Sequence, residues 1–139
     1  MRSIKYLIIT LLLTICLIPN IVNAAGNISV SPGSITITRG STAALSITAN
    51  NAAGRIDVST SNPNVASISE SSKFLDMQTW TITVTGKAAG SAIITITNTD
   101  VTTYDDEDLS GRTQTVHVVV TEPQQIQHHN LKVQLLIIR

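Results

Sequence analysis

The sequence predicts an all-β domain, a two-sheet antiparallel sandwich of seven to eight short strands. Apolar residues alternate with Ser and Thr in seven separate runs, which gives each run one buried and one polar face. Residues typical of turns separate these runs at short intervals. Ser, Thr, Val and Ile dominate the composition, and β-branched residues favour strands over helices. No run has a helical period with caps, so parallel β/α folds are disfavoured.

The alternating runs follow one another from residue 28 to residue 120. Their apolar positions are Ile28 and Val30; Ile35 and Ile37; Leu45 and Ile47; Ile56 and Val58; Trp80, Ile82 and Val84; Ile94 and Ile96; and Val116, Val118 and Val120. Val65 and Ile68 mark a shorter, less regular strand. The predicted turns are residues 31–33, 39–41, 50–54, 62–64 and 89–90.

Residues 1–24 have the layout of a secretory signal peptide. Arg2 and Lys5 precede an apolar run, residues 6–18, and a polar break follows it. We expect cleavage after Ala24, with Ala25 as the next candidate. The alternative is a retained membrane anchor, but the apolar run is shorter than the roughly 20 residues that span a bilayer. The sequence therefore predicts export, to the medium or the cell surface, and no membrane span after cleavage.

The single cysteine, Cys16, lies in this segment, so we expect a mature domain without a disulfide. Ile15 before it is not the small residue that a lipoprotein cleavage site requires. Without Arg2 and Lys5 the balance is seven basic against nine acidic residues, or minus two. This charge does not attract nucleic acid.

Several motifs, in the same order, resemble the group 2 bacterial immunoglobulin-like (Big) domain of surface proteins such as intimins and invasins. They are Ser31-Pro32 after the first strand, Gly40-Ser41-Thr42 with Leu45, residues 60–66 (Thr-Ser-Asn-Pro-Asn-Val-Ala), and residues 86–92 (Gly-Lys-Ala-Ala-Gly-Ser-Ala) before an Ile-Thr-Ile strand. The resemblance covers Asn27 to Glu122, and it implies an immunoglobulin-like sandwich. We therefore expect a signal peptide at 1–24, a bacterial immunoglobulin-like domain at 25–122, and a linker with a short apolar tail at 123–139.

The chain departs from the family pattern in two places. Val58 stands where the family often has a tryptophan, and Trp80 is expected to fill the same core from a neighbouring strand. Residues 69–79 form a longer connection than is usual in the family.

The segment after the domain has two parts. Residues 123–130 are polar and without a period, as in a linker. Residues 131–138 are apolar but too short to span a membrane. They mark either a truncated member of a multi-domain family or a strand added to a sheet edge.

The acidic loop at residues 100–111 is the best candidate for a metal site. Asp106, Asp108 and Ser110 stand at alternate positions before a glycine, like the opening of a calcium loop. The match fails at the twelfth position, where His117 replaces the bidentate glutamate. The alternatives are a calcium site of other geometry and a solvated acidic loop.

Nothing in the sequence predicts catalysis. No serine lies in a nucleophile elbow, and a sandwich of this size offers no deep cleft for a pair of carboxylates. His128 and His129 lack the spaced partners of a zinc site. His117, between two inward valines, is expected to point outward. Phe74, Trp80 and Tyr104 are the only aromatic residues after the signal, which counts against a sugar-stacking platform.

We expect a secreted or cell-surface immunoglobulin-like module with a structural or adhesive role, and no enzyme. The alternative is an accessory glycan- or cell-wall-binding domain, assisted by calcium, whose site is formed by residues 69–79 and 100–111. In either case the expected partner is an extracellular protein or glycan, because loops carry binding in such a scaffold.

Overall fold

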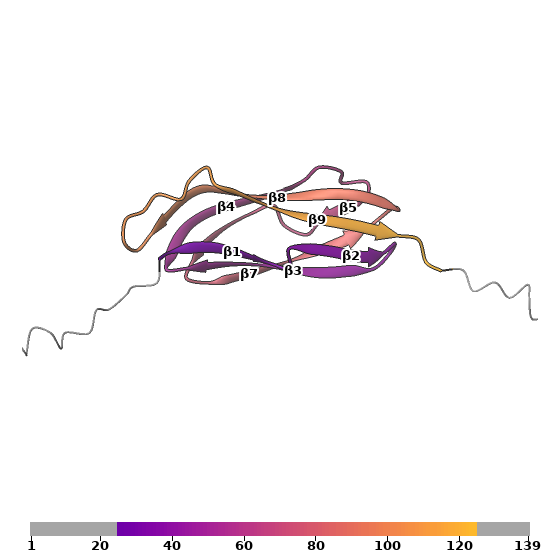
Figure 1. Ribbon diagram of the computed structural model, residues 1–139, viewed down its shortest axis with the longest axis horizontal. Helices are drawn as coiled ribbons and strands as arrows, with labels where there is room; N and C mark the ends of the chain where they lie inside the picture. The colour runs from indigo at the N-terminus through magenta and orange to yellow at the C-terminus, as the bar shows by residue number, and fades with distance from the viewer. Residues whose placement is uncertain (1–24, 125–139) are drawn as a thin grey trace, which may run out of the picture.

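A computed structural model describes residues 25–124, which form two sheets packed face to face (Figure 1). The first sheet contains, in spatial order, β1 (Asn27–Ser31), β3 (Thr42–Asn50), β7 (Thr79–Gly86) and β5 (Ala66–Ile68). The second contains β2 (Ser34–Thr38), β9 (Thr113–Thr121), β8 (Gly90–Thr103), β4 (Ala52–Thr60) and β6 (Ser72–Asp76). The all-β sandwich is confirmed. The predicted signal peptide and most of the tail lie outside the described residues.

The strands pair antiparallel except for β2 and β9, which are parallel from Ser34 opposite His117 to Thr38 opposite Thr121. The first edge of the sandwich explains this exception. β1 pairs with β3 in one sheet, and the chain then crosses to the other sheet without reversing its direction. β2 therefore runs in the same direction as the last strand, and a parallel pair was not part of the sequence prediction.

The core lies between the two sheets and is formed by the inward positions of the alternating runs. Trp80 on β7 is 2% exposed and lies opposite Ile47. Its indole Nε1–H donates to Glu70 Oε2 at 3.2 Å, so its one polar atom is satisfied. Val58 is buried in the facing sheet. The prediction that Trp80 fills the core is confirmed.

The structure has nine strands where the sequence predicted seven to eight. The additional strand is β6, which lies in the long connection 69–79 and pairs with β4. Two predicted loops are also shorter than expected. Residues 52–54 belong to β4, and β8 extends to Thr103, so the acidic loop proper is 104–112.

A bulge between Arg55 and Ile56 shifts the pairing of β4 with β8. Gly54, just before it, has a φ of 153°. A Cβ at this glycine would lie 1.9 Å from the backbone oxygen of Asp100. The two strands approach so closely here that only glycine fits.

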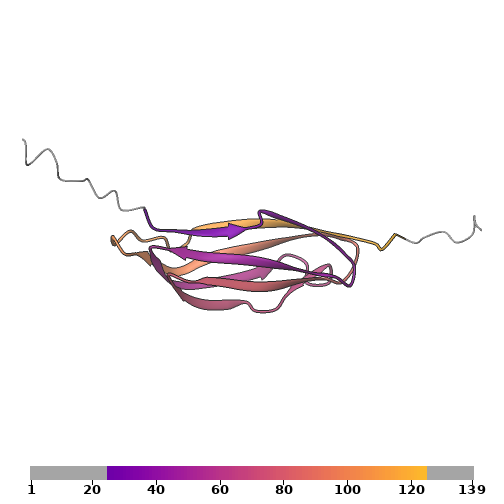
Figure 2. The same cartoon turned by 90° about the horizontal axis from the view of Figure 1, so that it is seen from below.

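The sandwich has two distinct ends, seen in Figure 1 and, turned by 90°, in Figure 2. At the proximal end, where β1 begins, lie the β3–β4 turn, the β6–β7 turn and the β8–β9 loop. At the distal end, where β9 ends, lie the β2–β3 and β7–β8 turns. The described chain thus begins at one end of the long axis and leaves at the other.

Candidate functional site

Two of the three aromatic side chains of residues 25–124 are exposed near the proximal end. Phe74 on β6 is 65% exposed, and Tyr104, just after β8, is 59% exposed. Met77, in the turn after β6, is 59% exposed. Single exposed apolar residues are ordinary, whereas several large ones on neighbouring segments mark an interaction surface.

Hydrogen bonds join the segments that carry these side chains. The Tyr104 hydroxyl donates to Asp76 Oδ1, and this bond is the main reason why the pKa of Tyr104 is raised. The Tyr104 N–H donates to the Asn51 carbonyl at 3.0 Å, and the Met77 N–H donates to the Ala52 carbonyl at 3.2 Å. Asp76 and Phe74 are two residues apart on β6, so they share one side of that strand. The fold therefore unites residues 69–79 and 100–111, which the sequence analysis named as a binding site.

The non-glycine residues with a left-handed backbone conformation also lie at this end. Asn51, Met77 and Asp106 have φ values of 43°, 46° and 65°, and they are the non-glycine residues with positive φ among residues 25–124. Asn and Asp tolerate this region, but an unbranched apolar side chain such as Met rarely adopts it. Such outliers cluster at functional sites, at a cost of roughly 1–3 kcal/mol each.

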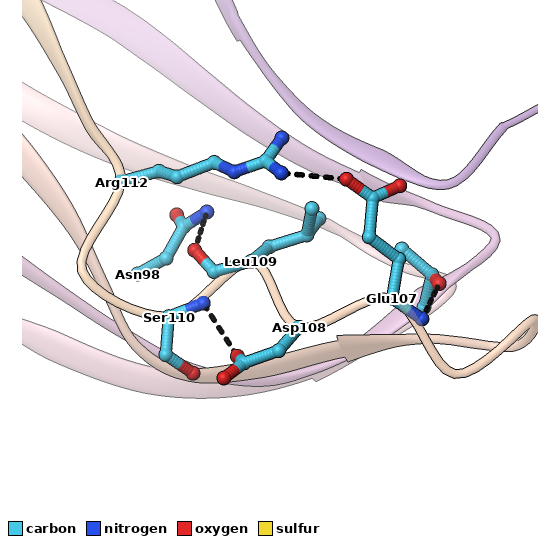
Figure 3. Close-up of polar contacts among 7 residues, drawn as sticks. Asn98, Glu107, Asp108, Leu109, Ser110 and Arg112 are labelled. Atoms are coloured by element: carbon cyan, nitrogen blue, oxygen red, sulfur yellow. Dashed lines mark hydrogen bonds and ion pairs between the residues drawn. The ribbon is translucent and has the colours of Figure 1, made fainter.

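The acidic loop is a compact structure rather than an open string of charges (Figure 3). Leu109 is buried beneath it, and its carbonyl accepts from Asn98 Nδ2 at 3.3 Å. Arg112 Nη2 lies 2.5 Å from Glu107 Oε1, in an exposed ion pair. The Glu107 N–H donates to Thr103 Oγ1 at 2.8 Å. These contacts fix the loop against the end of β8.

Two of the three predicted calcium ligands, Asp108 and Ser110, already have side-chain partners within the protein. Asp108 Oδ1 accepts from the Ser110 N–H at 2.8 Å (Figure 3). Ser110 Oγ accepts from the Val101 N–H at 3.1 Å. The Ser110 side chain, followed by its backbone N–H, lowers the pKa of Asp108. Residues 25–124 contain no group of three or more His, Cys, Asp or Glu side chains placed to hold a metal ion. A cation at Asp106, Asp108 and Ser110 would therefore need hydroxyl and backbone oxygens in addition to the two carboxylates, and the site stays a prediction.

The proximal end is strongly acidic. Asp76, Asp100, Asp105, Asp106, Glu107 and Asp108 stand against Arg55 and Arg112, so six acids and two bases give a net charge of minus four. Arg55 lies opposite both Phe74 and Asp100 in the strand register. At the distal end an open hollow of about 560 Å³ is lined by Arg39, Gly40, Glu122 and Pro123. Arg39 Nη1 lies 3.3 Å from Glu122 Oε1 there. The two ends therefore differ in charge.

The sequence did not predict that Phe74 and Tyr104 are exposed, because their number was considered but not the face of the strand or loop on which each lies. A local signal existed: Leu75 is apolar and next to Phe74, so in a strand only one of the two can face the core. The prediction for His117 is confirmed, since it is exposed between the buried Val116 and Val118.

Comparisons with known proteins find likeness in structure rather than in sequence. No family model and no curated protein matches the chain. Domains 1–6 of the surface layer protein SbsC match with a TM-score of 0.54 and 23% identity, over 76% of this chain and 14% of that one. Domains 4 and 5 of the S-layer protein SbsC match with a TM-score of 0.52 and 24% identity, over 71% of this chain and 54% of that one.

The chain thus spans about half or less of these two SbsC structures. A third match, the BIgI domain of beta protein from S. agalactiae bound to CEACAM1, has a TM-score of 0.35 and 13% identity. At these identities the likeness shows the fold alone: a β-sandwich similar to domains of a surface-layer protein. The finer assignment to the group 2 Big family stays a prediction. Within the part of the chain that the structure describes, no helix has the length and apolar character needed to cross a membrane.

Proposed function

We propose that the chain is an exported, non-catalytic structural module of the cell surface, which acts as a spacer. The observation that carries this proposal is the position of the two ends. The described chain begins at the proximal end and leaves at the distal end, so a pull on the chain acts along the sandwich. A module placed in series with other domains needs this arrangement.

The parallel pair β2–β9 suits the same role. These strands are near the beginning and the end of the described chain, and five register pairs join them. Opposite forces on the two ends of the chain would slide one strand along the other. All of the hydrogen bonds between them would then be loaded together, in shear, rather than one after another.

Two further observations support a surface structural module. The fold is similar to domains of a surface-layer protein. The exposed carboxylates Asp76, Glu107 and Asp108 accept hydrogen bonds from Tyr104, Arg112 and Ser110, so they are engaged in the structure of the loop. The sequence of residues 1–24 supports export.

Single-molecule stretching tests the spacer role. We expect a higher unfolding force when the chain is pulled through its two ends than when the pull is applied through Ser41→Cys and Pro123→Cys. The second pair of attachments lies at one end of β2 and β9, so the same strands would be unzipped one bond at a time. Equal forces in the two geometries would contradict a load-bearing role.

Surface display has its own test. Protease added to intact cells should cleave the protein, and the mature amino terminus should be Ala25. A protein protected until the cells are lysed would contradict display.

The second candidate function is binding of an extracellular protein or glycan at the proximal end, which the gathering of Phe74, Met77 and Tyr104 favours. Rings stack on sugar faces, and Asp76 beside them can accept sugar hydroxyls. Retention on peptidoglycan or polysaccharide should then fall in Phe74→Ser and Tyr104→Ser. It should persist in Thr115→Ser, a matched exposed position on the outer face of β9.

A further inference from the structure

The proximal end combines apolar side chains with uncompensated negative charge. Phe74, Met77 and Tyr104 are more than half exposed, and the acidic residues beside them leave a net charge of minus four. Within residues 25–124, the two cations of this surface are both paired: Arg112 with Glu107, and Arg55, which lies opposite Phe74, with Asp57. A ligand that covers this surface must therefore be apolar and basic at once.

The chain itself contains a segment with this chemistry. Residues 125–139 include Lys132 and Arg139, two histidines, and a majority of apolar residues from 131 onward, with no Asp or Glu. Its bases can meet the acidic loop, and its apolar side chains can cover the exposed rings. Residues 125–139 are thus complementary to the proximal end in both charge and apolar character.

The distance between the two ends of the sandwich decides whether residues 125–139 can bind the proximal end of their own molecule or that of a second copy. Gln124 follows β9, which ends at the distal end of the sandwich. β8 runs the length of the sandwich in 14 residues, about 45 Å at 3.3 Å per residue. Lys132 is eight residues beyond Gln124, which is at most about 28 Å of chain. Lys132 and most of the apolar residues therefore fall short of the proximal end of their own molecule. Only the last residues, from about 137 onward, could span about 45 Å of fully extended chain. A second copy aligned end to end would present its proximal end within reach.

We propose that the proximal end of one copy binds residues 125–139 of a second copy, so that the modules join head to tail. This inference rests on one part of the proposed function, namely that the proximal and distal ends of the module are different surfaces. The contact joins two different surfaces, so it is heterologous. A row of joined copies therefore still has a free proximal end on its first copy and a free tail on its last copy, and further copies can be added at both. Its occupant is a segment of the same sequence, and neither a glycan nor a metal ion is required.

The first test is sedimentation of the full chain, purified after export, over a range of concentrations. We expect the mean mass to rise with concentration and the association to weaken at high salt, because the charges are exposed and screened. A monomer at every concentration would overturn the proposal, and so would a mass that does not depend on salt.

The second test is an exchange of charge between the two surfaces. One variant carries Asp105→Lys with Glu107→Lys, and the other carries Lys132→Glu with Arg139→Glu. Each variant alone should remain monomeric, because its tail and its proximal end then fail to attract. A mixture of the two should associate again. The unchanged basic tail of the first variant then meets the unchanged acidic loop of the second, and the acidic tail of the second meets the altered loop of the first. Loss of association without rescue in the mixture would overturn the proposal.

Matched variants separate this contact from general effects of charge and folding. Ser59→Lys with Thr115→Lys places charge on the outer sheet face and should leave association unchanged. Phe74→Ser should weaken association at least about tenfold, as loss of an aromatic anchor does at interfaces, while circular dichroism shows the same fold. Retention of a monomeric protein on polysaccharide through Phe74 would overturn the proposal in favour of a glycan ligand. Surface display and shear resistance are measured separately, so their failure is distinct from failure of this contact.

Discussion

Phe74 and Trp80 lie six residues apart in the chain, and the fold uses them in opposite ways. Trp80 is enclosed by the core and donates its indole N–H to Glu70, whereas Phe74 faces solvent on an edge strand. Burial of an aromatic side chain stabilises a domain, while an exposed ring contributes to recognition.

Substitution of the two residues should therefore separate stability from binding. Trp80→Ala should lower the free energy of unfolding by about 3–5 kcal/mol, because it leaves a cavity in the core. Phe74→Ala should change it by no more than about 0.5 kcal/mol. Urea unfolding followed by circular dichroism measures both. Similar losses in the two variants would show that Phe74 is a core residue in solution.

Asp57 shows how residues on neighbouring strands set a pKa. Hydrogen bonds from Ser72 and Thr99 lower the pKa of this carboxyl, and Arg55 contributes less. Thr99 Oγ1 lies 2.5 Å from Asp57 Oδ2. Because the folded-state pKa is below that of the unfolded chain, the carboxylate stabilises the fold above the unfolded-state pKa. This contribution is lost as the pH falls through the folded-state pKa.

Asp57→Asn should accordingly flatten the acid side of the stability profile. Urea midpoints measured from about pH 5 down to about pH 2 should fall less steeply in the variant than in the unmodified protein. Thr99→Val should have a similar but smaller effect, since it removes one donor. An unchanged slope in both variants would contradict this assignment.

At the scale of elements, the close approach of β4 and β8 depends on one glycine. Gly54→Ala should destabilise the domain by about 1–3 kcal/mol from backbone strain alone, and the contact with Asp100 adds to this cost. Gly33 is the matched control, because a Cβ there meets no atom within 4 Å. Gly33→Ala should be neutral or stabilise by up to about 1 kcal/mol. Thermal or urea unfolding of the two variants gives the comparison.

Elements with strict alternation were predictable, and those without it were not. The runs that contain Leu45, Trp80 and Val116 became β3, β7 and β9, because burial of one face specifies a period of two. β6 was missed because a single residue, Leu75, is buried in it. Pairing with β4, rather than its own apolar pattern, makes this segment a strand.

At the scale of the whole molecule, calcium binding has a global readout. A cation that binds only the folded state raises the unfolding temperature. If Asp106, Asp108 and Ser110 bind calcium, millimolar calcium should raise the midpoint of the full chain, and Asp106→Ala with Asp108→Ala should abolish the rise. No shift with calcium would leave the loop as solvated charge, which is compatible with its proposed role in joining copies.

The sequence by itself determined the fold class, the inward face of most strands and the burial of Trp80. These properties depend on local alternation, which the chain carries residue by residue. Only the tertiary structure decided that β2 runs parallel to β9, that residues 69–79 meet 100–111, and that the exposed rings and the acidic loop share one end. These are contacts between segments far apart in the chain, and long-range pairing of strands determines them.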